Sequence, residues 1–218
     1  MVDIFDEVEE DLRAERAARL LKKYAWVIIA VALAIIGAAV GWQLWERWQS
    51  RQDMAAAQRY IAAQTAAESV PASGKAAAIA MLDRQAATAP EGYRTLSRLR
   101  AAELKADGGD LAGAVALWNQ VAADPSADRL LRDLASLMVA QRQLDHGDPA
   151  ELEARLKPLA TSDNPWFALA REQLALLDLR QGKKAEAKAA FKSLSIDIAA
   201  PTGLRQRAAA MLTGMGDE

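Results

Sequence analysis

The stretch AELKADGGDLAGAVALWNQV, residues 102–121, carries the pattern that decides the fold of this chain. Gly109 separates two alanine-rich apolar segments, and Gly147 and Gly182 follow at intervals of 38 and 35 residues, each between two segments of the same kind. The positions seven residues before and five, nine and twelve residues after each glycine repeat in character. In that order they are Ala102, Ala140 and Ala175; Ala114, Leu152 and Ala187; Trp118, Leu156 and Phe191; and Val121, Leu159 and Leu194. This period predicts helical hairpins that stack, because one hairpin cannot bury its apolar face alone.

Local signals favour one hairpin per repeat. Each glycine is expected to take the left-handed conformation that ends the first helix of its hairpin. Asp110 and Asp148 stand directly after their glycines and are predicted to cap the second helix, and Pro149 suits its first turn. Four prolines stand where second helices should end, namely Pro90, Pro125, Pro165 and Pro201.

Two further segments frame the repeats. Residues 70–74, VPASG, are expected to break the helix before them, because these residues favour turns. After the repeats, four residues that would share one helical face predict a closing helix that covers the last hairpin. They are Leu204, Ala208, Met211 and Leu212.

The glycine-centred pattern resembles the tetratricopeptide repeat. That repeat has a small residue in helix A, glycine at the turn, then small, aromatic and apolar positions in helix B, with proline near its end. The resemblance is best over residues 94–201 and weaker over residues 53–90, where Asp83 takes the aromatic position. Lys105, Gln143 and Asp178 stand where the family often has an aromatic residue in helix A, so an irregular solenoid is expected.

The resemblance also implies a binding groove. In tetratricopeptide folds the groove is lined mainly by helix A, and the matching positions here are called the groove positions. They are Leu96, Leu99, Glu103, Leu134, Leu137, Gln141, Leu169, Glu172 and Leu176. One interpretation is a site for an extended or helical apolar peptide, with Glu103, Gln141 and Glu172 as polar contacts. The other is that packing inside the stack consumes the leucines.

N-terminal to the repeats lies YAWVIIAVALAIIGAAVGWQLW, residues 24–45, with no charged side chain. A helix needs about 20 apolar residues to cross the roughly 30 Å hydrocarbon core of a bilayer. Trp26 at one end and Trp42, Trp45 and Trp48 at the other are typical of membrane interfaces. The alternatives are a buried core helix and a cleaved signal peptide. The length of the run and the charged leader before it favour an uncleaved signal anchor.

The flanks of this run predict its orientation. Basic residues resist translocation across the membrane, and more of them precede the run than closely follow it. The preceding ones are Arg13, Arg16, Arg19, Lys22 and Lys23, and the following ones are Arg47 and Arg51. We therefore expect a cytoplasmic N-terminus and a periplasmic C-terminal domain. Within the run, Gly37, Ala38 and Gly41 offer a small-residue face for packing another helix, although an Ala/Gly-rich span can produce this spacing by chance.

These features give an all-α chain with a single transmembrane helix followed by a tetratricopeptide-like solenoid of helical hairpins. The expected segments are a cytoplasmic amphipathic leader (1–23), the transmembrane helix (24–45), a helical continuation into the first hairpin (46–69), the repeats (70–201), and a closing helix and tail (202–218). The acidic leader is either a docking motif for a cytoplasmic partner or a solvated extension of the span.

The composition excludes several kinds of chemistry. The chain has no cysteine and a net charge of −2, so neither thiol chemistry nor a broad positive field for nucleic acid is expected. The one histidine, His146, is expected at a helix C-terminus, where it needs no catalytic role. We find no nucleophile elbow and no phosphate-binding loop. The sequence therefore predicts no catalytic residues, no metal site, no cofactor and no small-molecule substrate.

The order of the segments resembles a known bacterial family. The basic patch ending in LLKKYAW (20–26), the apolar run, GWQLWERWQSRQ (41–52) and the repeats are similar to the ancillary SecYEG translocon subunit family, the YfgM-like tetratricopeptide proteins of the inner membrane. The resemblance covers nearly the entire chain and is strongest over residues 5–60. It implies a single-pass inner-membrane protein whose periplasmic domain links emerging proteins at the Sec translocon to periplasmic chaperones.

Other functions remain open at this point. The alternative is a structural scaffold of a cell-envelope or cell-division complex, which predicts a stable oligomer. A periplasmic enzyme would instead need a compact polar pocket whose titrating groups have shifted pKa values. The oligomeric state is open at this point. The partner that the apolar run itself predicts is the lipid bilayer.

Overall fold

A computed structural model describes residues 4–68 and 72–216, with side chains from residue 22 onward except at residues 28 and 72–74. The described residues form helices and no strand, which confirms the all-α prediction. The chain divides into two compact units, Met1–Gln52 and Asp53–Glu218, and each is described by itself.

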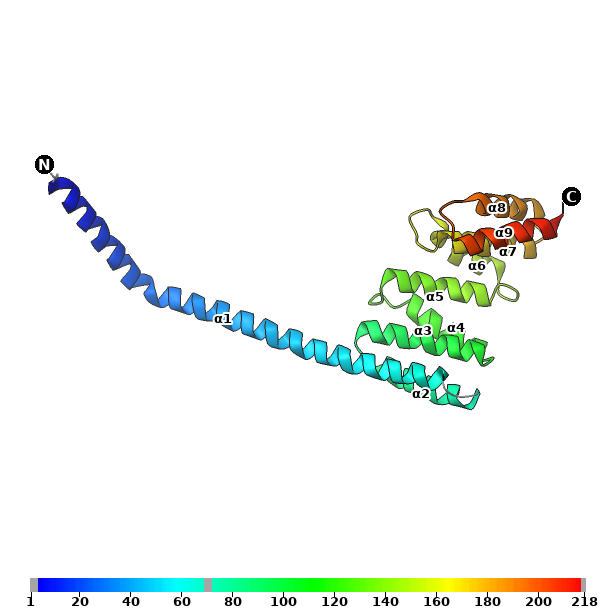
Figure 1. The fold of residues 1–218 in the computed structure, drawn as a ribbon, viewed down its shortest axis with the longest axis horizontal. Helices are drawn as coiled ribbons and strands as arrows, with labels where there is room; N and C mark the ends of the chain where they lie inside the picture. Colours follow the sequence, from blue (N-terminus) through cyan, green and yellow to red (C-terminus); the bar gives the residue numbers. More distant parts are fainter. Residues whose placement is uncertain (1–3, 69–71, 217–218) are drawn as a thin grey trace. The chain divides into compact units, whose positions relative to one another are not determined.

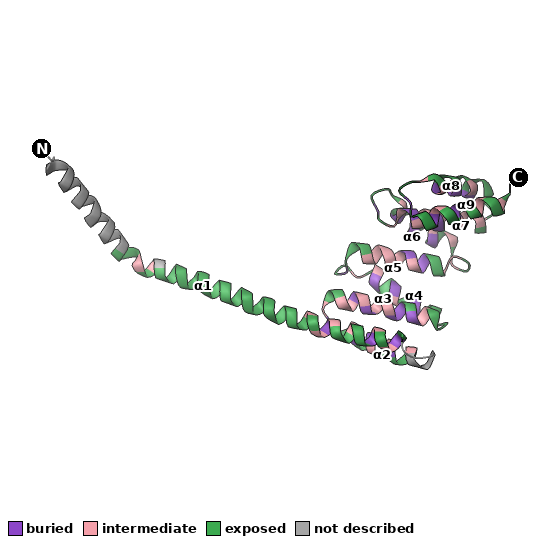
Figure 2. Cartoon of the chain, viewed as in Figure 1, coloured by how far each residue is buried: buried purple, intermediate pink, exposed green. Residues whose placement is uncertain are grey.

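The first unit consists of the N-terminal part of one long helix, α1 (Ile4–Glu68). Most of the large apolar side chains described between Tyr24 and Trp48 are exposed, and Figure 2 shows most of this part in green. Among the described residues this is the one helix long and apolar enough to cross a membrane. A core helix of a soluble protein would bury such side chains. The amphipathic face expected for the leader, by contrast, lies outside the described side chains.

The second unit is a stack of helix pairs (Figure 1). The helices that come first in each pair are called the A helices, and those that come second the B helices. The A helices are residues 53–68 of α1, α3 (Glu91–Asp107), α5 (Arg129–Arg142) and α7 (Phe167–Arg180). The B helices are α2 (Ala72–Thr88), α4 (Leu111–Ala122), α6 (Pro149–Leu156) with the 3₁₀ helix η1 (Lys157–Ala160), and α8 (Lys184–Ile196). A last helix, α9 (Thr202–Met215), follows them.

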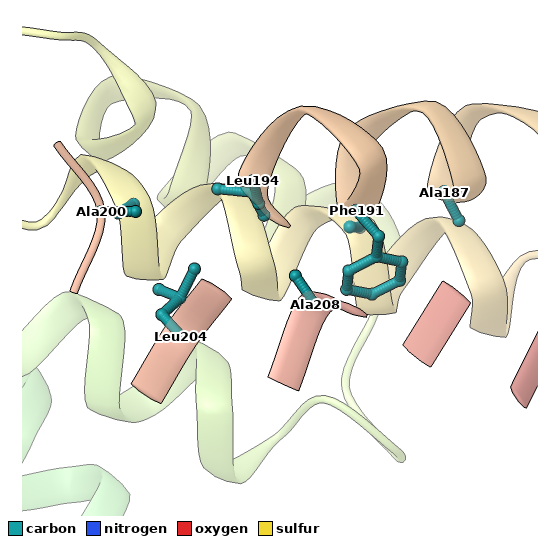
Figure 3. Close-up of a cluster of buried hydrophobic side chains, with 8 residues drawn as sticks. Ala187, Phe191, Leu194, Ala200, Leu204 and Ala208 are labelled. Carbon is teal, nitrogen blue, oxygen red and sulfur yellow. The ribbon is translucent and has the colours of Figure 1, made fainter. Parts of the chain in front are cut away.

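The core consists of four apolar clusters, and each is built from three consecutive helical segments. All twelve repeat positions identified in the sequence are at most 4% exposed. The repeating pattern in the sequence therefore identifies residues of the buried core. Trp118 and Phe191 are the largest fully buried side chains. Figure 3 shows the last cluster, in which Leu204 of α9 lies beside the α8 residues. The predicted closing helix therefore packs on the last hairpin, as solenoids require at their ends.

The three repeat glycines serve two different purposes. Gly109 (φ 88°) and Gly182 (φ 76°) adopt the predicted left-handed conformation. The same prediction for Gly147 is wrong, because its φ is not positive. Its N–H donates to the carbonyl oxygen of Gln143 at 2.7 Å, and a Cβ at Gly147 would lie 2.9 Å from that oxygen. Close approach, not handedness, excludes larger residues here.

The helix starts follow the predicted caps. The carboxylate of Asp110 accepts a hydrogen bond from the N–H of Gly113 at 2.9 Å, and that of Asp148 accepts one from Ala150 at 3.1 Å. The Gly113 N–H and the Lys105 ammonium lower the pKa of Asp110. The cap of Asp110 therefore stabilises the fold above the ordinary aspartate pKa of about 3.9, and this contribution is lost as the pH falls through the lowered value.

Two helix boundaries differ from the prediction. α2 begins at Ala72, so Ser73 and Gly74 belong to a first helical turn, where such residues are tolerated; the rest of the expected break lies outside the described residues. In the third hairpin, α6 ends at Leu156 and continues as η1, because Pro158 has no N–H to extend the α-helix. This hairpin is the irregular one.

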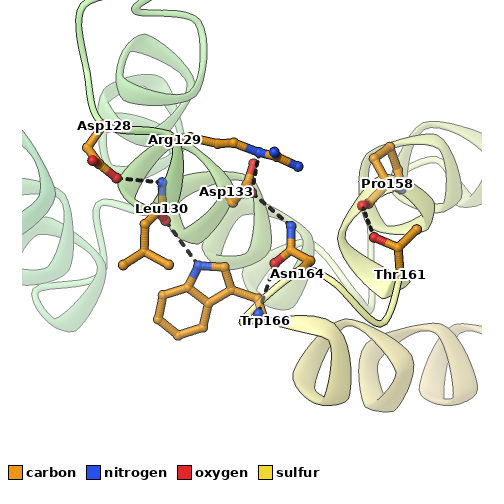
Figure 4. Close-up of polar contacts among 8 residues, drawn as sticks. All are labelled: Asp128, Arg129, Leu130, Asp133, Pro158, Thr161, Asn164 and Trp166. Carbon is orange, nitrogen blue, oxygen red and sulfur yellow. Dashed lines mark hydrogen bonds and ion pairs between the residues drawn. The ribbon is translucent and has the colours of Figure 1, made fainter.

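A polar junction supports the irregular hairpin (Figure 4). Asn164 is 3% exposed, donates from its amide to the Asp133 carboxylate at 2.8 Å, and accepts from the N–H of Trp166 at 2.9 Å. The Trp166 indole donates to the carbonyl oxygen of Leu130 at 3.0 Å. These bonds tie the segment before α7 to α5, so they fix the spacing of two A helices.

An ion pair fastens the closing helix to α7. The Arg207 guanidinium donates to both carboxylate oxygens of Glu172, with N–O distances of 2.8 Å. The Glu172 side chain is 8% exposed and that of Arg207 is 57% exposed. These hydrogen bonds raise the pKa of Arg207 above its ordinary value. A nearly buried carboxylate in this geometry depends on its bidentate partner.

Replacing Gly182 by alanine should destabilise the stack through backbone strain alone, because an added Cβ would meet no atom within 4 Å. We expect the free energy of unfolding to fall by about 1–2 kcal/mol, the strain of a left-handed alanine. Gly92→Ala, in the first turn of α3 with equally open space, is the matched control and should leave stability unchanged or raise it by less than about 0.5 kcal/mol. Urea titrations of the full chain, followed by circular dichroism, measure both. Equal shifts would contradict the account.

Substituting Arg207→Lys tests the anchor of α9. Lysine keeps the charge but cannot form the paired hydrogen bonds, so the free energy of unfolding should fall by about 1 kcal/mol, limited by the exposure of Arg207. Arg205→Lys on the same helix loses one exposed hydrogen bond to Thr202 and should change stability by less than about 0.5 kcal/mol. Thermal denaturation monitored at 222 nm compares the two, and indistinguishable midpoints would argue against the anchor.

Candidate functional site

The nine groove positions lie on α3, α5 and α7, and all of them line one of two hollows on the A helices. The larger hollow, of about 550 Å³, is lined by six groove positions: Leu134, Leu137, Gln141, Leu169, Glu172 and Leu176. The smaller, of about 250 Å³, is lined by Leu96, Leu99, Glu103 and again Leu134. Leu134 and Met138 line both hollows, so the two adjoin on α5. Together they form the A-helix groove.

The leucines both pack in the core and line the groove. Leu137 is 4% exposed and belongs to the cluster shared by α5, α6 and α7. Leu99, Leu169 and Leu176 are half-buried, with one side against a core cluster. The two interpretations drawn from the sequence therefore each describe part of this set. Packing fixes the leucine backbones, and their remaining surface makes the groove apolar.

The polar groove positions do not have equal roles. Glu172 is engaged by Arg207 and is not a free acceptor. Glu103 is exposed and pairs with the guanidinium of Arg100. Gln141 is exposed. Each hollow thus presents a carboxylate already paired with an arginine, where the sequence pattern alone suggested unpaired polar contacts.

Several groove residues come from elements that the sequence argument did not include. α9 contributes Arg207, Ala210 and Met211 to the larger hollow, and Tyr60 and Trp118 line the smaller one. Met211 is on the apolar face that the sequence predicts for the closing helix, and Arg207 is next to that face. Nothing in the sequence pairs Arg207 with Glu172, 35 residues earlier, because this contact depends on how α9 is seated on α7.

Two buried polar atoms accompany the groove. Gln173 lines the larger hollow, is 6% exposed, and its side-chain oxygen accepts no hydrogen bond from a described residue. Arg100 lines the smaller hollow, and its Nε donates to no described residue. Buried polar atoms are usually paired, so these two atoms are exceptions among the residues that line the groove.

The predicted membrane-interface residues are all on the surface of the first unit. Trp26, Trp42, Trp45 and Trp48 are 58–72% exposed. The rings of Trp42 and Trp45 lie edge to face with centroids 6.3 Å apart. On the small-residue face, Ala38 is exposed, and a Cβ added to Gly37 or Gly41 would meet nothing within 4 Å. Both features are therefore on the exposed surface of α1.

Among the residues that the structure describes, His, Asp and Glu include no group of three placed to hold a metal ion. His146 is exposed in the turn after α5, which already ends at Arg142, so the expectation that it stands at a helix C-terminus is wrong. The aspartates whose pKa is lowered serve caps and turns; Asp124, for example, accepts hydrogen bonds from Ser126.

Comparison with known proteins agrees with this architecture. Residues 19–208 match the family described as tetratricopeptide repeat-like domain. Neither the comparison with curated proteins nor that with solved structures gave a match. The family match includes the A helices, the B helices and the whole apolar run. Domains of this kind are protein-interaction folds. The chain therefore belongs to the tetratricopeptide repeat-like domain family.

Proposed function

We propose that this protein is a membrane-anchored interaction module whose A-helix groove binds an apolar segment of another polypeptide. The observation that carries the proposal is the convergence of all nine groove positions on two adjoining hollows of about 550 and 250 Å³. Volumes of this size accommodate a few side chains at a time, which suits an extended or helical peptide. No turnover is required, so we propose that the protein is not an enzyme.

The setting of the module is also a proposal. The apolar run would span the bacterial inner membrane as an uncleaved anchor, with the leader in the cytoplasm and the repeats in the periplasm. The resemblance to the YfgM-like family and the basic residues before the run support this arrangement. Tethering would raise the effective concentration of the groove near polypeptides that emerge from the membrane.

The partners that fit this setting are the Sec translocon and periplasmic chaperones. The module would be an ancillary subunit that passes emerging proteins from one to the other. The face formed by Gly37, Ala38 and Gly41 would allow a translocon helix to approach closely, since no described side chain fills the space beside the two glycines. These partners rest on the resemblance of segment order and are tested separately below.

The orientation predicts a clear labelling pattern, because the chain has no native cysteine. A membrane-impermeant maleimide should label Gln120→Cys, on the exposed surface of α4, in intact bacterial spheroplasts. Glu10→Cys in the leader should be labelled only after the membrane is permeabilised. The reverse pattern would invert the topology, and loss of the leader from the mature chain would indicate a cleaved signal peptide.

Photo-crosslinking from the groove tests the proposed function. A photoreactive residue at Leu99 or Leu176 should capture exported polypeptides or periplasmic chaperones in living cells. The same residue at the exposed B-helix positions Gln120 and Ala189 should not, because these sites lie outside both hollows. At Trp45 it should capture translocon subunits.

Two outcomes would contradict the proposal. If only Trp45 captures a partner, the membrane segment is the binding element and the groove is not. If Leu99 and Leu176 capture only other copies of this chain, and the purified protein sediments as a stable oligomer, the alternative of a structural scaffold is favoured.

A further inference from the structure

The two ends of the stack differ in how they are closed. At the C-terminal end, α9 covers the α7–α8 pair. At the N-terminal end, Figure 1 shows α3 and α4 on one side only of the first pair, which consists of residues 53–68 and α2. A hollow of about 340 Å³ lies on this pair and is lined by residues of these two helices alone. We call it the edge hollow; it is lined by Arg59, Ala62, Met81, Arg84, Gln85 and Thr88.

The walls of the edge hollow are held together from within. Gln85 is 4% exposed, and its side-chain amide donates a hydrogen bond of 2.6 Å to the carbonyl oxygen of Ala56. This bond crosses from α2 to α1 beneath the hollow. The cluster of Ala63, Ala78 and Leu82 fixes the same two helices from the side that α3 covers. Contacts between the two helices of the first hairpin therefore hold the walls of the hollow in place.

The charge of the edge hollow has one sign. Arg59 and Arg84 line it and are exposed, and neither forms an ion pair with a described residue. Arg84 uses only its Nε, which donates to the carbonyl oxygen of Ala80 in the same helix. The carboxylates of this hairpin that the structure describes do not line the hollow; they are Asp53, Glu68 and Asp83. Two guanidinium groups in one hollow, neither paired with a carboxylate of a described residue, favour an acidic occupant.

Apolar side chains also line the edge hollow. Met81 and Ala62 line it together with the two arginines. Met54 and Ile61 on α1 are 66% and 61% exposed, but they do not line the hollow and lie on a different face of the helix from Arg59 and Ala62. Terminal repeats in solenoids usually carry a polar outer face, so apolar side chains in this hollow favour a partner that packs on them.

From these observations we infer that the edge hollow docks an acidic amphipathic helix of a partner protein, which stacks on the first hairpin as an additional layer. Its apolar stripe packs on Ala62 and Met81, and its carboxylates pair with Arg59 and Arg84. The same helix-on-helix packing joins α3 to α2 on the other side of the pair. This surface is distinct from the A-helix groove, with which it shares no lining residue.

The test uses the full chain in nanodiscs of zwitterionic phosphatidylcholine, with fluorescent helical peptides as probes. One peptide of about 18 residues, or roughly five turns, carries a leucine stripe flanked by glutamates, and a matched peptide has lysine for each glutamate. Fluorescence anisotropy should show binding of the acidic peptide and at least tenfold weaker binding of the basic one. The affinity for the acidic peptide should fall as NaCl is raised, because salt screens exposed charge pairs.

Charge reversal locates the site. The variant R59E/R84E should weaken binding of the acidic peptide about tenfold or more, and it should improve binding of the basic peptide. K184E/K192E changes the net charge equally on exposed positions of α8 and should alter affinity by less than about twofold. Circular dichroism of both variants checks that the exposed substitutions leave the fold intact.

Three results would overturn the inference. Equal affinity of the unmodified chain for the two peptides would show that charge does not select the occupant. Binding that survives R59E/R84E but is lost in Leu176→Glu would place the acidic helix in the A-helix groove. Self-association of the chain that R59E/R84E abolishes would identify a second copy as the occupant. None of these results depends on whether the A-helix groove binds exported polypeptides.

Discussion

The stack depends on how closely neighbouring helices approach one another through alanine. Ala102, Ala140 and Ala175, one on each A helix from α3 to α7, are completely buried where that helix meets its neighbours. A larger side chain at these points would push the helices apart and open the core, because protein interiors are close-packed. The large residues Trp118, Leu156 and Phe191 fill the layer behind them. Each cluster needs three consecutive helical segments, so no hairpin is complete without its neighbours.

The same packing creates the groove. Since the B helices and the core hold one side of each A helix, the opposite side of α3, α5 and α7 is left as a continuous apolar surface. The irregular third hairpin could have disturbed that surface, because α6 is short and ends before Pro158. The hydrogen bonds of Asn164 and Trp166 to α5 compensate for the lost helical turns and keep α7 in place. A polar junction at the edge of the stack thus maintains an apolar site on its face.

The two ends of the stack present different surfaces, although both end in a pair of packed helices. α9 covers the last pair and adds Arg207, whose pairing with Glu172 closes one end of the groove. The first pair has no described covering helix on its outer side and presents a hollow lined by two arginines and by the apolar Ala62 and Met81. Uncovered terminal layers are usually polar, and this one combines charged and apolar side chains. Residues 53–68, which form one wall of this open edge, are the C-terminal part of α1.

The sequence by itself determined the helical class, the hairpin period, the buried positions and the apolar run, because each follows from local spacing or from length against a fixed thickness. It also located the caps at Asp110 and Asp148, which are contacts within one turn. The tertiary structure alone decided why Gly147 must be glycine, how Arg207 meets Glu172, and which groove leucines keep exposed surface. These depend on distances between segments that are dozens of residues apart or on backbone approach, and no periodic pattern encodes such distances. The edge hollow belongs to this second group, since Arg59 and Arg84 become neighbours only when α2 packs back on α1.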